Sequence, residues 1–447
     1  MIKIYDTMTR SLRDFVPLTE NVVNMYVCGP TVYNYIHIGN ARSAVAFDTI
    51  RRYFEYCGYT VNYISNFTDV DDKIIKAANE AGISTKELSD KFIAAFMEDT
   101  GQLGIKPATQ NPRVINYMDE IIAFVSTLVD KGFAYVSEGD VYFRVAKSNN
   151  YAKLANKTLE DLEIGASGRT DAETERKENP LDFALWKAAK EGEVSWDSPW
   201  GLGRPGWHIE CSVMATEILG DTIDIHGGGA DLEFPHHTNE IAQSEAKTGK
   251  TFANYWMHNG FVNVDNEKMS KSLGNFVTVH DMLKTVDGQV LRFFLATQQY
   301  RKPINFTEKA IHDAEVNLKY LKNTHSLPLT DQVNQDELQT YLEAFQEAMD
   351  DDFNTANGVT VLFDMAKWIN SGNYDQTVKD AFEKMLQVFG IVFEEEVLDE
   401  DIEKLIEERQ AARANKDFAT ADRIRDELAA QGIKLLDTKE GVRWTRD

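Results

Sequence analysis

Apolar residues near the start of the chain switch between strand and helix periodicities. Asn21–Val27 is a mostly apolar run that ends at Cys28-Gly29-Pro30, which predicts a buried strand followed by a turn. Asn40–Tyr56 carries apolar side chains every three or four positions and predicts a helix. Tyr59–Ile64 alternates and is rich in Val, Ile and Tyr, so it predicts a second strand. This βαβ unit implies a parallel sheet with helices on both faces.

The rest of the chain divides by pattern into an insertion, a return to the sheet and a helical region. Helical periodicity covers 73–103 and 113–131, and short strands (141–145) and a polar stretch (165–179) follow it. Apolar strands return at 222–226 and 254–264. The pattern is helical from 305 to about 393. An acidic linker (394–401) then leads to two amphipathic helices and a short strand at Val442-Arg443-Trp444.

Composition places the chain among ordinary soluble globular proteins. Its 447 residues are 43% hydrophobic and 27% charged, which predicts two to four domains. Apolar runs fall well short of the roughly 20 residues that span a bilayer, and Met1–Asp6 does not resemble the start of a secretory signal. Because Cys28, Cys57 and Cys211 are too few for a disulfide framework, we expect a cytoplasmic protein.

The net charge of −25 argues against a nucleic-acid partner, but the charge is unevenly distributed. Residues 331–400 hold 17 acidic and 3 basic side chains, a net of −14. Residues 401–447 hold 11 acidic and 10 basic side chains, a net of −1. Since more than half of the acidic excess lies in one segment, a nucleic-acid site elsewhere stays open.

Two short motifs contain the residue types that bind phosphates. His37-Ile38-Gly39-Asn40 lies where the first strand meets the helix, whose free N–H groups and positive dipole end suit an anion. Gly39 lets a ligand approach the backbone closely. Lys268-Met269-Ser270-Lys271-Ser272 places two lysines at i and i+3, where they can stabilise charge that builds on phosphorus. A capping histidine and a solvated lysine loop explain either motif alone, but together they predict a nucleotide site.

Four dispersed residues have the types found in tetrahedral zinc sites. His236 and Glu240 are i, i+4 on one face of an expected helix. Cys28 lies at a strand end, and Cys211 opens a helical run. Spacing alone does not assemble this set, because buried cysteines are usually core residues. Three further histidines compete as ligands: His208, His226 and His237.

A glycine run, His226-Gly227-Gly228-Gly229-Ala230-Asp231, directly follows a predicted strand. Its glycines let the backbone touch a ligand, and Asp231 can bind a ribose hydroxyl or an ammonium group. A flexible turn with an aspartate cap is the alternative, but the preceding strand favours a binding site.

The two phosphate motifs on a parallel sheet resemble those of the class I aminoacyl-tRNA synthetases. Longer segments make the chain similar to the cysteinyl-tRNA synthetases in particular, from its first residues to its last: Met25–Tyr33, Phe67–Lys73, Arg204–Ser212, Phe234–His237, Asp350–Thr355 and Ala421–Arg425. Asn40 replaces the usual final histidine of the first motif, as is common in this family. Thr238 stands where an acidic residue is frequent, but it is not a ligand position.

The resemblance implies an α/β, Rossmann-like catalytic domain with an insertion, then a helical bundle and a small α/β tail. We expect these divisions: first half of the catalytic domain 1–130, connective insertion 131–200, second half 201–260, lysine loop and stem-contact region 261–305, bundle 306–395, and anticodon-proximal domain 401–447.

The resemblance also implies an activity. L-Cysteine would be activated by ATP, with Mg²⁺, to cysteinyl-adenylate and transferred to the 3′-terminal adenosine of tRNA(Cys). One Zn²⁺ per chain, held by Cys28, Cys211, His236 and Glu240, would prefer the substrate thiolate to serine, so that no editing domain is needed. The implied catalytic residues are His37, Asn40, Lys268 and Lys271. The implied ATP contacts add Gly39, Gly228, Asp231 and Ser270, and the implied cysteine contacts are Gly29, Thr31, Thr68 and Trp207.

Several alternatives stay open at this stage. Trp207 could close over a substrate or be a core aromatic residue, and Trp444, beside Arg443 and Arg446, could stack on an anticodon base or close the tail domain. A cysteine ligase that uses a small amine acceptor and a non-catalytic zinc- and nucleotide-binding regulator are the rival functions. Intact His37 and both motif lysines oppose the second rival. By resemblance, we expect a monomer without a membrane partner.

Overall fold

The computed structural model describes residues 1–166, 174–394, 400–438 and 441–446. The chain forms two compact units, Met1–Val392 and Phe393–Asp447. The finer division of the first unit given above stays a prediction.

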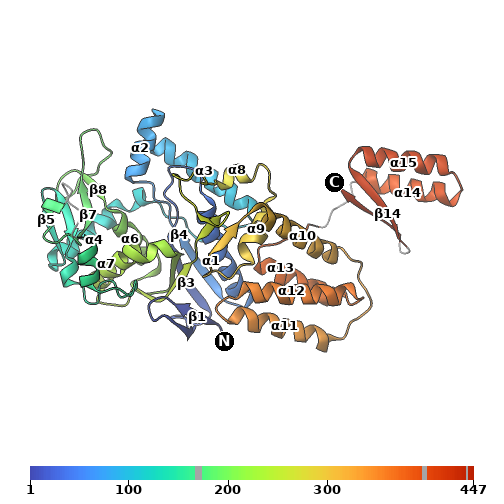
Figure 1. Ribbon diagram of the computed structural model, residues 1–447, viewed down its shortest axis with the longest axis horizontal. Helices are drawn as coiled ribbons and strands as arrows, with labels where there is room; N and C mark the ends of the chain where they lie inside the picture. Colours follow the sequence, from blue (N-terminus) through green and yellow to red (C-terminus); the bar gives the residue numbers. More distant parts are fainter. Residues whose placement is uncertain (167–173, 395–399, 439–440, 447) are drawn as a thin grey trace. The chain divides into compact units, whose positions relative to one another are not determined.

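A four-stranded parallel sheet forms the centre of the first unit (Figure 1). Its strands have the order β10-β9-β3-β4, with these bounds: β3 Val22–Val27, β4 Thr60–Ser65, β9 Ile223–Gly229 and β10 Ala253–Asn259. Helix α1 (Ile38–Tyr56) connects β3 to β4, as the hydrophobic pattern predicts. A hairpin of β1 (Lys3–Asp6) and β2 (Ser11–Asp14) precedes the sheet. The predicted parallel α/β fold is confirmed.

The glycine run belongs to strand β9 and is not a loop that follows it. Residue by residue, Gly227, Gly228 and Gly229 pair with Met257, His258 and Asn259 of β10. A Cβ atom on Gly227 would lie 2.4 Å from the ring of Phe47, so helix α1 packs directly against the bare backbone there. Close packing of helix on strand therefore explains this glycine at least as well as ligand approach does.

The predicted helix over 73–103 is two helices, α2 (Asp72–Ala81) and α3 (Thr85–Gln102). Ser84 starts the second one, because its side chain accepts the N–H of Glu87 at 3.1 Å. Helix α4 (Met118–Asp130) follows a short turn, η1 (Val114–Tyr117).

The predicted insertion contains an antiparallel sheet of order β5-β6-β7-β8. Its elements have these bounds: β5 Ala134–Ser137, β6 Asp140–Phe143, η2 Val145–Lys147, α5 Leu159–Ala166, η3 Thr174–Arg176, β7 Phe183–Ala188 and β8 Gly203–Pro205. Part of the predicted polar stretch, residues 167–173, lies outside the described residues.

Helix α6 (Trp207–Leu219) and helix α7 (Thr238–Thr248) flank strand β9 in sequence. Since α6 begins at Trp207, Cys211 lies one turn inside it and does not open it. His236 lies in an irregular turn, η5 (Glu233–His237), which follows η4 (Ala230–Leu232). The extended backbone of Phe234 lies before His236, and His236 and Glu240 face each other at i, i+4, with Nε2 of His236 2.9 Å from Oε1 of Glu240.

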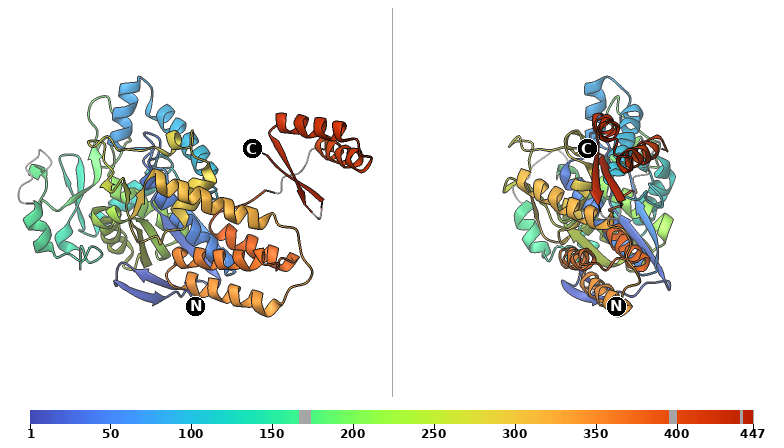
Figure 2. Two further views of the ribbon diagram at one scale, coloured as in Figure 1. Left: turned by 45° about the vertical axis from the view of Figure 1, so that its right-hand side comes forward. Right: turned by 90° about the vertical axis from the view of Figure 1, so that its right-hand side faces the viewer.

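Helices α10 to α13 lie side by side as a bundle, in orange in both ribbon views (Figures 1 and 2). These elements connect the sheet to the bundle and form it: β11 Val262–Val264, β12 Glu267–Lys268, α8 Val279–Met282, α9 Gly288–Ala296, β13 Ile304–Phe306, α10 Glu308–His325, α11 Gln335–Asp350, α12 Thr355–Asn370 and α13 Gln376–Val388.

Buried polar contacts join helix α1 to α9 and to the bundle. Arg292 of α9 forms an ion pair with Asp48 of α1 at 2.6 Å and donates to the carbonyl of Phe389 at 2.8 Å. Asp352, in the motif between α11 and α12, accepts the hydroxyl of Tyr300 at 2.6 Å and Nε of Arg301 at 2.7 Å. The helical region is thus fixed to the helix that starts at the first phosphate motif.

The second unit contains two helices and a two-stranded ribbon: α14 Glu400–Ala414, α15 Phe418–Ala430, β14 Ile433–Thr438 and β15 Gly441–Arg446. Trp444 is half-buried and packs against an apolar cluster that includes Ile424 and Leu428. This packing favours a core role for Trp444, and its contact with an anticodon base stays a prediction. Most of the predicted linker, residues 395–399, lies outside the described residues.

Candidate active site

A cavity of about 690 Å³ opens at the carboxyl ends of β3 and β9. Parallel sheets bind ligands at this edge. Eleven of the predicted site residues line it: Cys28, Gly29, Thr31, His37, Gly39, Asn40, Trp207, Asp231, Lys268, Ser270 and Lys271. Tertiary structure thus gathers segments that are more than 200 positions apart. The roles assigned to these residues stay predictions.

His37 caps helix α1 and at the same time faces the cavity. The ring atom Nδ1 of His37 accepts the backbone N–H of Asn40 at 3.2 Å, and the backbone N–H of His37 donates to Oδ1 of Asn40 at 3.1 Å. The backbone N–H of Asn40 is therefore engaged by the histidine and is not free for a phosphate. Since Nδ1 is an acceptor, the neutral imidazole carries its proton on Nε2 and can donate from there.

The lysine loop is tied to the first phosphate motif by backbone pairing. The N–H of Ile38 donates to the carbonyl of Val277 at 3.1 Å, and the N–H of Val279 donates to the carbonyl of Ile36 at 3.0 Å. Inside the loop, the N–H of Ser270 donates to Oδ1 of Asn275 at 2.8 Å. This pairing holds both lysines at the mouth of the cavity, beside the start of helix α1.

Charges around the cavity act on His37. Burial lowers the pKa of its imidazole, the carboxylate of Asp231 raises it, and the ammonium groups of Lys271 and Lys73 lower it further. The net result is a pKa below the ordinary value of 6.5. His37 is therefore neutral at pH 7, which agrees with its role as an acceptor at Nδ1.

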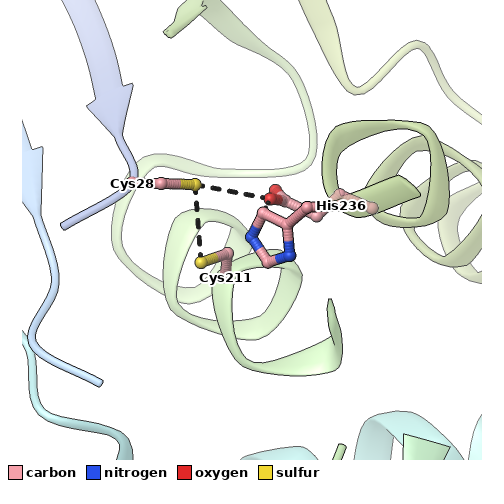
Figure 3. Close-up of side chains that lie close together, drawn as sticks. Cys28, Cys211 and His236 are labelled. Carbon is pink, nitrogen blue, oxygen red and sulfur yellow. Dashed lines mark hydrogen bonds and ion pairs between the residues drawn. The ribbon is translucent and has the colours of Figure 1, made fainter. Parts of the chain in front are cut away.

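The four predicted metal ligands lie together beside the cavity, and Figure 3 shows Cys28, Cys211 and His236 converging. Their ligand atoms, with that of Glu240, all lie within 4.8 Å of one another. Sγ of Cys28 lies 3.6 Å from Sγ of Cys211 and 3.5 Å from Oε1 of Glu240.

These spacings fit a tetrahedral zinc ion. With usual zinc–ligand bond lengths, two sulfur ligands lie about 3.8 Å apart, and a sulfur and an oxygen lie about 3.6 Å apart. Nε2 of His236 is buried without a hydrogen-bond partner among the described residues, although it lies 2.9 Å from Oε1 of Glu240. A buried nitrogen that approaches a carboxylate oxygen without a well-directed hydrogen bond suits two ligands of one metal ion.

A second set of ligand atoms overlaps the first: Cys28, His226, His237 and Glu240. Nε2 of His226 lies 2.6 Å from Oε2 of Glu240, and Nε2 of His237 lies 3.4 Å from Sγ of Cys28. Nδ1 of His237 also lies 2.8 Å from Nε2 of His258. Of the three histidines that the sequence suggests as competing ligands, two therefore lie close to candidate ligand atoms, namely His226 and His237.

The electrostatics of the cluster favour a bound cation. Burial raises the pKa of the Glu240 carboxyl, but His226 and His236 outweigh it and hold the pKa at about 2. The hydrogen bond from Cys28 lowers the pKa of the Cys211 thiol to about 6. Burial lowers the pKa of His236 in the same cluster, but Glu240 and Cys211 raise it to about 10, so a protonated imidazole compensates this negative charge. A metal ion bound at the same place would take over that compensation.

The predicted cysteine contacts separate into cavity residues and a supporting residue. Trp207 is 40% exposed and stacks on the ring of His236 at 4.0 Å, so it is not a core aromatic. Thr68 is buried, and its carbonyl accepts the N–H of Val32 at 3.1 Å, which supports the turn that carries Thr31. Gly228, which was predicted as an ATP contact, packs inside β9 against Leu232. The structure thus places Thr68 and Gly228 behind the cavity wall.

Sequence reasoning missed Asn66, which supports the cavity wall from the end of β4. Its Oδ1 accepts the N–H of Gly29 at 3.0 Å, and it lies 3.8 Å from Sγ of Cys211. A Cβ atom on Gly29 would lie 1.7 Å from the carbonyl oxygen of Asn66, so only glycine fits here, beside the four candidate metal ligands. The sequence offered one signal that could have identified Asn66: it is a polar residue directly after a predicted strand.

Three known family models match most of the chain. Residues 14–316 match the tRNA synthetases class I (C) catalytic domain, residues 344–394 the DALR domain, and residues 395–444 the cysteinyl-tRNA ligase anticodon binding domain. The solved structure of Mycobacterium tuberculosis methionyl-tRNA synthetase in complex with methionyl-adenylate has the same fold. It aligns with a TM-score of 0.59 and 15% identity over 82% of this chain and 89% of that chain.

The parallel sheet, its two phosphate motifs and these matches define a class I aminoacyl-tRNA synthetase. Full-length relatives specify the amino acid. The cysteine–tRNA ligases of Streptococcus thermophilus (strain CNRZ 1066), Streptococcus pyogenes serotype M6 and Streptococcus agalactiae serotype III are 95%, 83% and 82% identical, over 100% of this chain and of each relative. The chain belongs to the cysteine–tRNA ligase family, which confirms the resemblance seen in the sequence.

Among the described helices, none is long and apolar enough to cross a membrane.

Proposed function

We propose that the chain activates L-cysteine with ATP, accompanied by Mg²⁺, and transfers the cysteinyl group to the 3′-terminal adenosine of tRNA(Cys). A zinc ion would select the substrate thiolate. The observation that carries this proposal is the double position of Cys28, which belongs both to the metal cluster and to the lining of the cavity. Amino-acid selection and phosphate chemistry would then meet at one strand end.

In the activation step, a carboxylate oxygen of cysteine attacks the α-phosphorus of ATP, and the bond to the bridging oxygen of pyrophosphate breaks. Nε2–H of His37 would donate to a phosphate oxygen, since Nδ1 is already engaged by Asn40. Lys268 and Lys271 would stabilise the charge that develops on the phosphates. The chain's residues thus position reactants and stabilise charge, without a covalent enzyme intermediate.

Cys28, Cys211, His236 and Glu240 would hold the zinc ion. Bound there, zinc supplies a soft Lewis acid that favours a thiolate far more than a neutral hydroxyl group. His226 would orient Glu240 through the 2.6 Å contact with Oε2. We prefer this set to the one with His226 and His237, because it contains two sulfur ligands and leaves both histidines to orient neighbours.

Selection by one polar group supports an enzyme without editing. Sites built around one polar substrate group discriminate by roughly 10⁴ to 10⁵, whereas apolar pockets reach only about 10². Cysteine and serine differ only in the side-chain atom, which is sulfur in cysteine and oxygen in serine. The full-length identity with tRNA ligases and the matched anticodon-binding domain support tRNA, and not a small amine, as the acceptor. By analogy with the family, we also propose a cytoplasmic monomer.

A charging assay tests the proposal. Radiolabelled cysteine, ATP and Mg²⁺ are supplied with tRNA(Cys), with an amino sugar as a competing acceptor. We expect label on tRNA alone, and cysteine-dependent pyrophosphate exchange that K271A reduces by two orders of magnitude or more. Label on the amino sugar would indicate the small-amine ligase, and an absence of exchange would indicate the non-catalytic regulator.

A further inference from the structure

The ammonium group of Lys271 lies between two aromatic rings. Its Nζ is 5.5 Å from the ring centre of Tyr33 and 5.5 Å from that of Phe276. Lys271 is not among the lysines that form ion pairs with carboxylates over the described parts of the chain. An exposed lysine has many rotamers, so these two ring faces are the contacts that restrict where its charge can be.

The two rings come from segments next to the two phosphate motifs and differ in what holds them. Tyr33 follows strand β3, where its N–H donates to the carbonyl of Thr31 at 3.0 Å and Val32 is paired with Thr68. Phe276 lies in the lysine loop itself and packs edge-on against His37, at 5.3 Å between ring centres. Tyr33 therefore lies in the turn that Thr31 and Thr68 hold, whereas Phe276 belongs to the segment that carries the two lysines.

An aromatic wall has a chemical advantage over a carboxylate at this position. A ring face attracts an ammonium group through its quadrupole but does not neutralise it. A carboxylate would have to release Lys271 before the lysine could bind phosphate. Lys73 lies at the same 5.5 Å from the ring of Tyr33, so this ring faces two cations that would otherwise repel each other across the cavity.

We propose that Tyr33 is a positioning residue for Lys271: its ring face holds the ammonium group beside His37, so that the charge is in place when ATP binds. This inference rests on the proposed role of Lys271 in activation. Because the held charge matters most in the transition state, loss of the ring should lower kcat of pyrophosphate exchange more than it changes KM for cysteine.

A double-mutant cycle tests the inference in the full-length chain. Y33L should lower kcat of cysteine-dependent pyrophosphate exchange by roughly 3- to 30-fold, the range expected for loss of a cation–π contact. Y33F keeps the ring and should stay within about twofold of the unmodified chain. In a K271A background, Y33L should have almost no further effect, since Tyr33 would act through the lysine.

Tyr35 provides a matched control, because it stacks on His280 at 4.1 Å and does not contact Lys271. The fold change in kcat that Y35L causes should be the same in the unmodified chain and in the K271A background. An equal effect of Y33L in both backgrounds would overturn the inference and leave Tyr33 a structural role. Loss of activity in Y33F equal to that in Y33L would also overturn it, because the hydroxyl would then be responsible. Unchanged exchange in K271A would instead overturn the proposed role of the lysine.

Discussion

The Sγ atoms of Cys28 and Cys211 lie 3.6 Å apart, although 183 positions separate them in the sequence. One sulfur follows a central strand, and the other lies one turn inside helix α6. No local pattern connects these two elements. Packing of α6 and α7 beside the sheet brings the sulfurs together, next to a histidine and a carboxylate that complete the proposed ligand set.

We predict that C28S loses bound zinc and cysteine activation together. Serine oxygen is a harder and far more basic ligand than thiolate, so the site would lose a strong ligand and part of its negative charge. Metal content by atomic absorption and pyrophosphate exchange measure the two effects. C57S is the matched control, because Cys57 is exposed and lies outside the cluster, and it should keep both zinc and activity. Normal exchange in a zinc-free C28S chain would contradict the prediction.

His226 should tune the metal site without being a ligand. It is buried and contacts Oε2 of Glu240 at 2.6 Å, so H226Q should weaken zinc affinity by about 10- to 100-fold, as is usual for residues that orient a ligand. Competition with a chelator of known affinity measures this. H312Q, an exposed histidine, should leave the affinity unchanged. If H226Q abolished binding as completely as C28S while C211S kept zinc, the alternative ligand set would be correct.

The ionisation of His37 should respond to its neighbours in a defined direction. Lys271 lowers the pKa of its imidazole and Asp231 raises it. K271A should therefore raise the His37 pKa, and D231N should lower it, as followed by NMR of the imidazole resonances during a pH titration. Opposite shifts would contradict this account of the cavity's charge.

The same pKa predicts how stability depends on pH. The folded-state pKa of His37 lies below the ordinary value of 6.5, so the unfolded chain takes up the proton first as the pH falls. The free energy of unfolding should therefore decrease as the pH falls below 6.5, and the N-terminal cap of helix α1 should weaken as Nδ1 becomes protonated. H37N removes this titrating group and should show a shallower decrease over that range in urea unfolding.

The buried ion pair between Arg292 and Asp48 should matter far more than pairs at the surface. R292M would leave the Asp48 carboxylate buried beside its remaining partner, Arg52, and would release the carbonyl of Phe389. We expect a loss of about 3–5 kcal/mol in the free energy of unfolding. K309M removes the exposed Lys309–Asp313 pair and should cost less than about 1 kcal/mol. Equal unfolding midpoints in urea for the two variants would contradict this ranking.

Local pattern was enough for the elements around the first motif. The strand before Cys28, the helix after His37 and the next strand follow from apolar spacing, because that spacing depends only on which face of an element is buried. The pattern places the glycine run after a strand, but in the structure the run continues strand β9. Glycine is needed at position 227 because the ring of Phe47 packs against the backbone there. Propensity could not reveal this, because the reason is a neighbour 180 residues away.

The sequence by itself determined the fold class, the family and the chemical types at the site, since all three are carried by residue identity and short-range spacing. Only the tertiary structure decided that His37 accepts the N–H of Asn40, that His226 contacts Glu240, and that Tyr33 lies against Lys271. These contacts depend on how distant elements pack, and packing is a property of the whole core. The same reason explains why the four dispersed residues of the proposed metal site come together only after folding.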